Sequence, residues 1–240
     1  MTEQEKAVLR ENIARVKDRA AEAAIRAGRR PEEITLVAAT KMNNAERVRF
    51  AVENGIAVCG ENRVQALLEK YELSAYGSAD LQFIGTLQTN KVKYLIGKVS
   101  LIQSVGSLRL AQAIDRAAGK HGIRQPILLE VNIGREQAKS GFMPNEIWEF
   151  LDKTSELGNL DIRGLMAIPP AAPSDGNNLY YFHEMSQLFI DISTKKYDNV
   201  SMACLSMGMT NDFEDAISCG STMIRVGTAI FGARSYAGQP

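Results

Sequence analysis

Apolar residues along the chain follow two alternating patterns, short β-branched runs and longer stretches with helical spacing. The short runs predict strands at residues 34–40, 57–59, 81–84, 101–104, 127–131, 162–168, 203–206 and 223–226. The helical spacing predicts an opening helix that ends before Gly28, and further helices at residues 45–53, 64–72, 92–96, 108–118, 145–155, 179–193 and 212–218. Strands and helices therefore alternate along the whole chain.

Eight strands, each followed by a helical pattern within 240 residues, predict an α/β fold. This number and size favour a closed (β/α)8 barrel, the TIM barrel, over an open doubly wound sheet. No linker, low-complexity tract or shift of composition divides the chain, so residues 1–240 are predicted to form a single domain. Residues 169–178, the longest irregular segment, are expected to form a surface loop after the sixth strand.

Composition and charge narrow the range of partners. Lysine plus arginine and aspartate plus glutamate number 28 each, so no overall field attracts nucleic acid or an anionic membrane. Hydrophobic residues make up 45% of the chain, yet no apolar run approaches the ~20 residues that span a bilayer, and the amino terminus is charged. These features predict a globular cytoplasmic protein that binds neither nucleic acid nor membrane.

Cysteines and histidines give no indication of a metal site. Cys59, Cys204 and Cys219 are scattered, with no Cys-x-x-Cys pair and no histidine at metal-ligand spacing. Cys59 and Cys204 lie in apolar strand-like segments, where a free thiol packs as a small hydrophobic group. His121 and His183 fall in or at the end of predicted helices, where a solvated or capping role is expected. We therefore predict neither a metal centre nor a disulfide framework.

The first predicted strand delivers a lysine at its carboxyl end. Residues 34–41 read Ile-Thr-Leu-Val-Ala-Ala-Thr-Lys, an apolar run that ends in Lys41. Desolvation of the ammonium group lowers its pKa toward that of a nucleophilic neutral amine, which makes Lys41 a candidate Schiff-base lysine. The alternative is that Lys41 only marks the point where the strand reaches the surface, with its stem extending to water.

The ends of the last two strands have the composition of an anion site. Ser206 and Thr210 supply hydroxyl groups, while Gly208 and Gly227 allow backbone N–H groups to approach a ligand. Thr228 follows directly, and the loops after strands seven and eight are the usual phosphate site of such barrels. Taken singly, the two glycines are also typical of tight strand-to-helix turns. A phosphate site combined with a reactive amine indicates a ligand with both an aldehyde and a phosphate, pyridoxal 5′-phosphate (PLP).

Several motifs together resemble one known family. In chain order they are Val37-Ala-Ala-Thr-Lys41, Gly60-Glu-Asn-Arg-Val-Gln65, Phe83-Ile-Gly-Thr-Leu-Gln-Thr-Asn-Lys91, Gly164-Leu-Met-Ala-Ile168, Leu205-Ser-Met-Gly-Met-Thr210 and Ile224-Arg-Val-Gly-Thr-Ala-Ile-Phe-Gly-Ala-Arg234. Their number, order and spacing closely resemble those of the pyridoxal phosphate homeostasis proteins. The resemblance implies the fold of the alanine racemase N-terminal domain, a barrel of the predicted kind. The chain departs from the family at Gln82, where relatives often have histidine, and at Met42-Asn43 after the lysine.

The resemblance also implies a role for individual residues. Lys41 resembles the lysine that forms the Schiff base, Asn62 a residue near the ring substituents, and Arg225 the arginine that faces the pyridine nitrogen. The implied phosphate ligands are Thr210, Gly227 and Thr228, with Ser206 assisting either directly or through a neighbour. A segment at residues 136–141 also matches the family, although a solvated loop is its default interpretation.

Three of these residues have a structural alternative in the sequence. Asn62 suits a cap on the following helix, and Thr210 suits a cap on a helix that starts near Asn211. Arg225 can pair with a carboxylate such as Glu61. All three structural roles are compatible with ligand binding.

Three functions are compatible with the sequence. The resemblance implies a non-catalytic monomer that holds PLP on Lys41, supports vitamin B6 and amino-acid homeostasis, and passes the cofactor to PLP-dependent apo-enzymes. A guanidinium beside the pyridine nitrogen weakens the ring as an electron sink, and no length after Arg234 is left for the second domain that completes a racemase. The first alternative is a small amino-acid racemase that uses Lys41 and an unidentified second base. The second is a class I aldolase-like barrel in which Lys41 attacks a phosphorylated sugar.

Overall fold

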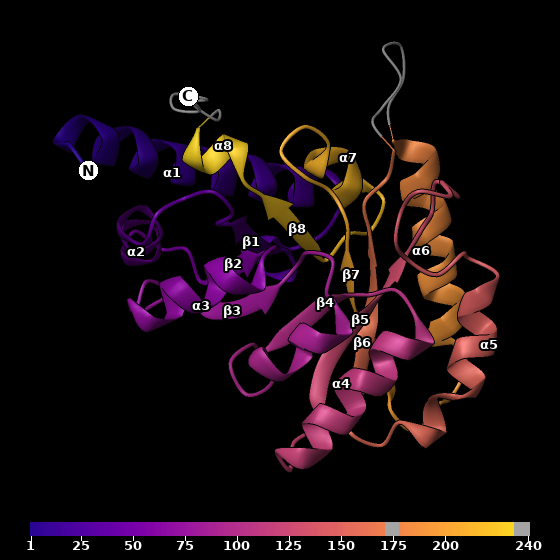
Figure 1. Ribbon diagram of the computed structural model, residues 1–240. Coiled ribbons are helices and arrows are strands. Elements are labelled where there is room, and N and C mark those ends of the chain that lie inside the picture. Colours follow the sequence, from indigo (N-terminus) through magenta and orange to yellow (C-terminus); the bar gives the residue numbers. More distant parts are fainter. Residues whose placement is uncertain (171–177, 233–240) are drawn as a thin grey trace.

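The computed structural model describes residues 1–170 and 178–232 of the chain, and within them strands and helices alternate (Figure 1). Most of the predicted loop at 169–178, and Arg234 of the last motif, lie outside the described residues. The strands are β1 (Thr35–Ala39), β2 (Val58–Glu61), β3 (Asp80–Phe83), β4 (Leu101–Val105), β5 (Gln125–Val131), β6 (Leu160–Ala167), β7 (Val200–Ser206) and β8 (Met223–Val226). The α-helices are α1 (Glu3–Arg26), α2 (Ala45–Glu53), α3 (Val64–Glu72), α4 (Leu108–Lys120), α5 (Glu146–Asp152), α6 (Leu179–Ser193), α7 (Phe213–Ser218) and α8 (Thr228–Phe231). Short 3-10 helices lie at η1 (Pro31–Glu33), η2 (Thr89–Tyr94) and η3 (Thr154–Glu156).

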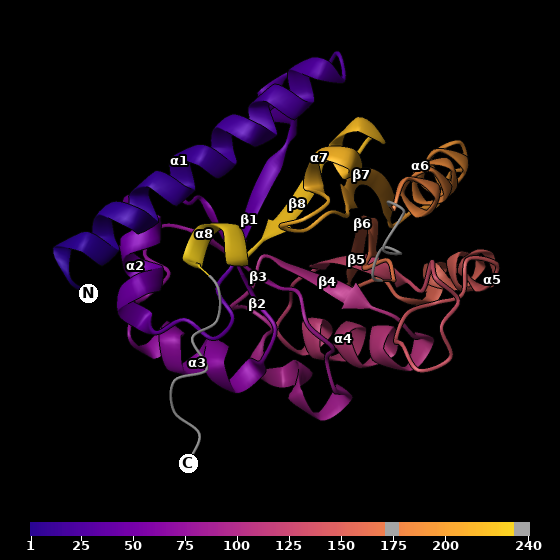
Figure 2. The same ribbon diagram turned by 90° about the horizontal axis from the view of Figure 1, so that it is seen from above.

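The eight strands close into a barrel in the order β1 to β8, seen from above in Figure 2. All neighbouring strands are parallel, and β1 closes the ring by pairing with β8 in the register Val37 to Arg225. The predicted TIM barrel is therefore confirmed. Because the strands are parallel, all of their carboxyl ends meet at one mouth of the barrel.

Alternate residues of each strand face the barrel interior, where they pack in layers. The apolar layer consists of the buried residues Val37, Leu101, Leu128, Met166 and Met223. Two residues further along β4, β5 and β8, the same inner face carries the buried polar residues Gln103, Glu130 and Arg225. An apolar floor thus lies beneath a polar layer at the mouth.

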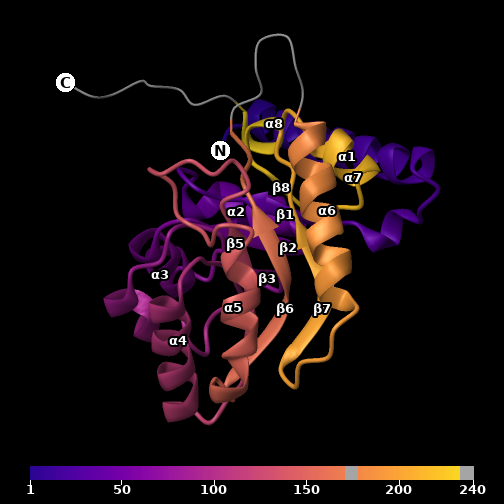
Figure 3. The same ribbon diagram turned by 90° about the vertical axis from the view of Figure 1, so that its right-hand side faces the viewer.

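A shell of helices covers the outside of the barrel. Figure 3 shows the side on which α4 and α6 lie against β5, β6 and β7. The longest helix, α1, starts with a capping box in which the Thr2 hydroxyl accepts from the Glu5 N–H and the Glu5 carboxylate accepts from the Thr2 N–H. It buries one face and contacts α2, α7 and α8. The first helix therefore lies beside the last two, next to the β1 and β8 closure.

The helix expected at residues 92–96 is instead the 3-10 helix η2. Its bonds connect residues three apart, such as the Leu95 N–H and the Val92 carbonyl at 2.9 Å. The segment lies between the buried Leu87 and Gly97, whose left-handed φ of 77° turns the chain toward β4. A short 3-10 helix therefore covers this part of the barrel.

Among the other elements, most of which differ from their predicted bounds by one or two residues, the clearest departures are at α5 and β7. The helix expected at 145–155 is divided into α5 and η3, where the Thr154 hydroxyl donates to the Leu151 carbonyl at 2.7 Å and competes with the helical bonding. The strand expected at 203–206 starts earlier, at Val200. Its first residues alternate between half-buried and exposed, a pattern of one covered face that a search for apolar runs overlooks.

Candidate functional site

The first and last strands, β1 and β8, are neighbours in the barrel, so residues that are far apart in the sequence meet at their carboxyl ends. Val37 and Ala38 of β1 pair with Arg225 and Val226 of β8. A Cβ atom on Gly227 would lie only 3.3 Å from the Ala39 carbonyl oxygen, so the two strand ends stay in contact beyond the ladder. Lys41 and the residues that follow Gly227 therefore leave the barrel at the same part of its rim.

Lys41 is half-buried and lies in a tight turn directly after β1. The Asn43 N–H donates to the Thr40 carbonyl at 3.2 Å, and the Asn43 side-chain amide donates to the Lys41 carbonyl at 3.1 Å. Met42, between them, has a left-handed φ of 64°, which is uncommon for a residue with a long side chain. The turn therefore fixes the backbone from which the Lys41 amine extends.

A buried cluster of Thr40, Glu61 and Lys70, which we call the clamp, lies behind this turn. The Thr40 hydroxyl donates to Glu61 Oε1 at 2.7 Å, and Lys70 Nζ donates to the Thr40 carbonyl at 2.8 Å. Lys70 also forms an ion pair with Glu61, whose side chain is fully buried. The clamp joins the ends of β1 and β2 to α3 at the residue immediately before Lys41.

Asn62 follows the clamp and is held by close backbone packing. A Cβ atom on Gly85 would lie 2.2 Å from the Asn62 carbonyl oxygen, so only glycine allows the ends of β2 and β3 to approach this closely. Helix α3 begins after Arg63 and has no side-chain cap. The alternative that Asn62 caps this helix is therefore wrong.

Arg225 is buried in the polar layer, with 4% of its surface exposed. Nη1 donates to Ser206 Oγ at 2.5 Å and Nη2 donates to the Ala167 carbonyl at 2.8 Å. Glu61 bonds within the clamp instead, so the suggested pairing of Arg225 with Glu61 is wrong. Burial lowers the Arg225 pKa to about 10, against the opposing effect of nearby carboxylates, and the guanidinium therefore remains charged at neutral pH.

The loop after β7 packs directly against β8. The Gly208 carbonyl accepts from the Arg225 N–H at 3.0 Å, and Gly208 itself has a left-handed φ of 93°. The Thr210 hydroxyl accepts from the Ala229 N–H at 3.4 Å, next to Gly227 and the exposed Thr228. The N-cap of α7 is Asp212, so the alternative that Thr210 caps that helix is wrong. The three predicted phosphate ligands therefore come from two loops that meet at the start of α8.

Ser206 is fully buried, and its hydroxyl group bonds to two other side chains. It accepts from Arg225 Nη1 and donates to Gln103 Oε1 at 2.7 Å. The sequence left open whether Ser206 acts directly or through a neighbour. These contacts favour an action through Arg225.

Three inward-facing polar residues were not predicted as part of the site: Gln82, Gln103 and Glu130. Glu130 Oε1 accepts from the Ser140 hydroxyl at 3.1 Å, and burial raises the pKa of its carboxyl group. The signal for Gln103 and Glu130 lies in strand alternation, because each stands two residues after an apolar residue of the floor, Leu101 and Leu128. Polar residues at inner positions of a barrel strand mark the layer that faces the mouth.

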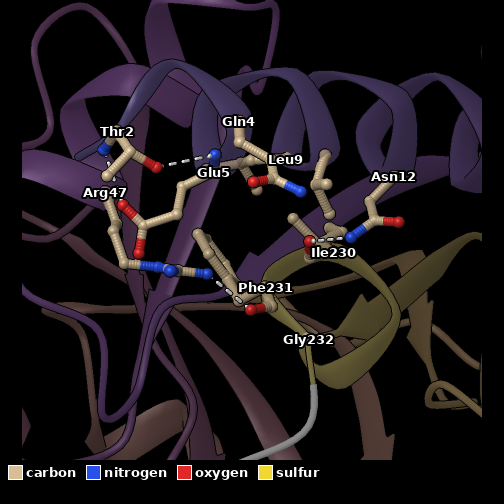
Figure 4. Close-up of a pocket in the computed structure, with 10 residues that line it drawn as sticks. Thr2, Gln4, Glu5, Leu9, Asn12, Arg47, Ile230, Phe231 and Gly232 are labelled. Atoms are coloured by element: carbon tan, nitrogen blue, oxygen red, sulfur yellow. Dashed lines mark hydrogen bonds between the residues drawn. The ribbon is translucent and has the colours of Figure 1, made fainter.

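A separate cavity of about 280 Å³ lies at the other end of α8, between α1 and α2 (Figure 4). In Figure 4, Arg47 points to α8 and donates to the Phe231 carbonyl at 2.6 Å, while Asn12 donates to the Ile230 carbonyl at 3.0 Å. Both bonds satisfy carbonyl groups at the carboxyl end of α8. The cavity thus borders the residues that hold α8, whose amino end carries Thr228.

Side chains that could ligate a metal are dispersed over the described part of the chain. Within residues 1–170 and 178–232, no three histidine, cysteine, aspartate or glutamate side chains are grouped to hold a metal ion. Cys59 is buried as predicted, and burial raises the pKa of its thiol to about 12, so it packs as a hydrophobic group. In the same described ranges, every helix is too short or too polar to cross a bilayer.

Comparisons with known proteins give the family. Residues 6–235 match the family model for the alanine racemase N-terminal domain. The chain is 42% identical to a pyridoxal phosphate homeostasis protein of Aquifex aeolicus, over 94% of this chain and 98% of that protein. It is 36% identical to the protein of the same name from Escherichia coli K12, over 94% and 97% of the two chains. A structure of PipY from Synechococcus elongatus with PLP bound superposes with a TM-score of 0.80 at 29% identity, over 93% of this chain and all of that one. The chain therefore belongs to the pyridoxal phosphate homeostasis protein family.

Proposed function

We propose that this protein binds pyridoxal 5′-phosphate as a Schiff base on Lys41 and takes part in the intracellular homeostasis of vitamin B6 and amino acids. The observation that carries the proposal is the convergence at the closure of β1 and β8. There, a lysine on a fixed turn lies close to the strand that presents the anchored Arg225. The names of the relatives and the PLP bound to PipY support the choice of ligand.

The chain's own residues fit the three chemical parts of this ligand. When bound, the cofactor supplies an aldehyde that reacts reversibly with an amine, and Lys41 is the amine at the rim. Thr210, Gly227 and Thr228 meet where hydroxyl and backbone N–H groups suit a phosphate. Arg225 is a buried cation with donors only, which suits the unprotonated ring nitrogen. Asn62, on the neighbouring strand end, is the residue we assign to the ring substituents.

The same arginine supports a role as a carrier rather than as a racemase. A guanidinium that keeps its charge at neutral pH opposes protonation of the ring nitrogen, and an unprotonated ring is a poor electron sink. Relatives are named as homeostasis proteins. A carrier would release its cofactor to PLP-dependent apo-enzymes, and we expect it to act as a cytoplasmic monomer.

Reductive trapping tests the Schiff base. The purified protein is incubated with PLP, reduced with borohydride, digested and mapped by mass spectrometry, in parallel with Lys41→Met and Lys98→Met. Lys98 is an exposed lysine before β4, at the opposite end of the barrel, and serves as the matched control. We expect one pyridoxyl adduct on Lys41 in the wild type and in Lys98→Met, and none in Lys41→Met. An adduct on other lysines alone would refute the proposal.

A second measurement separates the carrier from an enzyme. The PLP-loaded protein is incubated with single L-amino acids, and the enantiomers are separated by chiral chromatography. A carrier leaves the L-form unchanged apart from the slow reaction of free PLP, which a protein-free control measures. Turnover well above that control with any amino acid would establish a racemase and overturn the carrier role.

A further inference from the structure

A chain of hydrogen bonds runs through the barrel from the mouth toward its opposite end. From Ser206 it continues to Gln103, whose Nε2 donates to Gln82 Oε1 at 2.6 Å. Gln82 Nε2 then donates to Asp80 Oδ2 at 3.1 Å, at the first residue of β3. We call Ser206, Gln103 and Gln82 the relay.

The relay is shielded from water over its whole length. Ser206 and Gln103 are fully buried, Gln82 is 4% exposed, and only the terminal Asp80 is exposed. A buried amide or hydroxyl without a partner is destabilising, so each member of the relay is restricted to the orientation that satisfies its neighbours. Gln103 is also held from below, because its Nε2 lies 3.1 Å from Met223 Sδ in the apolar floor.

The bonds of the relay all point in one direction. Ser206 has a single hydroxyl hydrogen, and it is donated to Gln103 Oε1. The hydroxyl therefore presents only a lone pair to Arg225, and a guanidinium can only donate. If Gln103 did not accept this hydrogen, the hydroxyl could rotate and would no longer offer Arg225 a fixed acceptor.

The relay orients Arg225 without reducing its charge. Its three members are neutral, whereas the charged groups that act on Arg225 are the carboxylates of Asp212 and Glu130. A carboxylate in the place of the Ser206 hydroxyl would compete with the cofactor for the guanidinium. A neutral acceptor holds one terminal nitrogen while the positive charge remains effective at the mouth.

We propose that Gln103 is a positioning residue of the cofactor site, which sets the orientation of the Arg225 guanidinium through Ser206. The proposal rests on the proposed function only for the identity of the ligand. The link from Gln103 to Arg225 is a property of the protein without ligand. It can therefore be tested in both forms.

The decisive variant is Gln103→Met, which keeps the length of the side chain and removes both its acceptor and its donor. Gln125→Met is the matched control, because Gln125 is also buried but bonds to the Val99 and Pro126 carbonyls outside the relay. Gln103→Glu is the conservative variant, which keeps an oxygen acceptor for Ser206 and also serves if Gln103→Met fails to fold. Exchange of the Arg225 side-chain N–H groups is measured by NMR in the ligand-free proteins, with Arg225→Lys to assign the signal. The absorption maximum and Kd of bound PLP are measured in the same set.

In Gln103→Met we expect exchange of the Arg225 N–H groups to be at least about ten-fold faster. We also expect a shifted absorption maximum and a roughly ten-fold weaker Kd for PLP, the effect of losing one charge-assisted bond. Gln125→Met should keep the exchange rate and the spectrum of the wild type, and Gln103→Glu should recover both at least in part. Wild-type exchange and spectrum in Gln103→Met, or equal changes in Gln125→Met, would overturn the proposal. If the wild type takes up no PLP, the proposed function fails, while the exchange rates in the ligand-free proteins still decide the role of Gln103.

Discussion

The clamp and the relay each support one side of the candidate site, but with different chemistry. The clamp lies outside the barrel wall and contains a buried ion pair, Glu61 with Lys70. The relay lies inside the barrel and consists of neutral hydroxyl and amide groups. The clamp ends on a main-chain group, the Thr40 carbonyl, whereas the relay ends on a side chain, the Arg225 guanidinium.

The difference matches the different roles proposed for Lys41 and Arg225. For Lys41, whose amine we propose as the reactive group, the clamp fixes the neighbouring backbone from behind, through the Thr40 carbonyl. Two opposite charges suit this task because they compensate each other away from the mouth. In the proposed function Arg225 keeps its own charge at the mouth, and the neutral relay provides orientation without an opposing charge. Two predictions test this distinction, and a third concerns a buried carboxyl group outside both systems.

The largest effect is expected for Lys70→Met. The change removes the cation and leaves the fully buried Glu61 carboxylate without its ionic partner, so the free energy of unfolding should fall by roughly 3–5 kcal/mol. Urea denaturation measures this loss. The double variant Lys70→Met with Glu61→Gln removes both charges and should recover a large part of it.

A surface pair provides the control for this prediction. Lys153 bonds to Glu149 on the exposed side of α5, where water screens the two charges, so Lys153→Met should leave the free energy of unfolding nearly unchanged. If Lys70→Met lowers the free energy of unfolding no more than Lys153→Met does, the clamp does not hold the end of β1.

A smaller effect is expected for Gln82→Met. This variant interrupts the relay at Gln82, which is the next member after Gln103 and lies further from Arg225. Gln103 keeps its acceptor role toward Ser206 but loses the Gln82 oxygen as the acceptor of its Nε2, so the free energy of unfolding should fall by about 1–2 kcal/mol. The Kd for PLP should weaken by about two- to three-fold, less than in Gln103→Met. A larger effect on PLP binding than that of Gln103→Met would contradict the order of the relay.

The smallest effect concerns Glu130, a buried carboxyl group that belongs to neither system. Burial raises its pKa in the folded protein, so the folded protein keeps a proton that the unfolded chain releases above the ordinary pKa of about 4.5. Stability is therefore lost as the pH rises through the folded pKa. A glutamine side chain at this position does not titrate, so Glu130→Gln should raise the Tm at pH 7 but not at pH 4, by about 2–4 °C for each kcal/mol regained.

Melting curves between pH 4 and pH 7.5 test this difference, with Glu149→Gln as the control. A side-chain hydrogen bond and ion pairing with Lys153 lower the Glu149 pKa. The ionised Glu149 therefore stabilises the folded protein above its ordinary pKa, and this stability is lost as the pH falls through the folded pKa. A gap between wild type and Glu130→Gln that stays constant with pH would mean that Glu130 does not titrate differently in the folded protein.

Much of the architecture could be predicted because barrel strands have buried faces on both sides. The run from Ile34 to Thr40 is apolar or β-branched throughout, and so its strand is evident from composition alone. The start of β7 was missed because Ser201 is exposed there, and η2 was predicted as an ordinary helix because so short a segment does not distinguish the 3-10 period from the α-helical one.

The site was predicted only in part, for a physical reason. Lys41 and Arg225 stand at strand ends in recognisable motifs, and their neighbourhood follows from barrel closure. The partners that hold them are far away in sequence: Lys70 is a helix residue that resembles any solvated lysine, and Gln103 lies 103 residues from Ser206. Which polar residue meets which depends on register, and register is set by the whole barrel.

Closure of the barrel by β1 and β8 also sets the time at which the site can exist during synthesis. Lys41 leaves the ribosome before Arg225 and the loop that follows it, because most of the barrel lies between them in the sequence. At ~5–20 residues per second this interval is on the order of ten seconds or more. During that time the nascent chain carries Lys41 without the strand that closes the barrel beside it, so the candidate site exists only once β8 has been made.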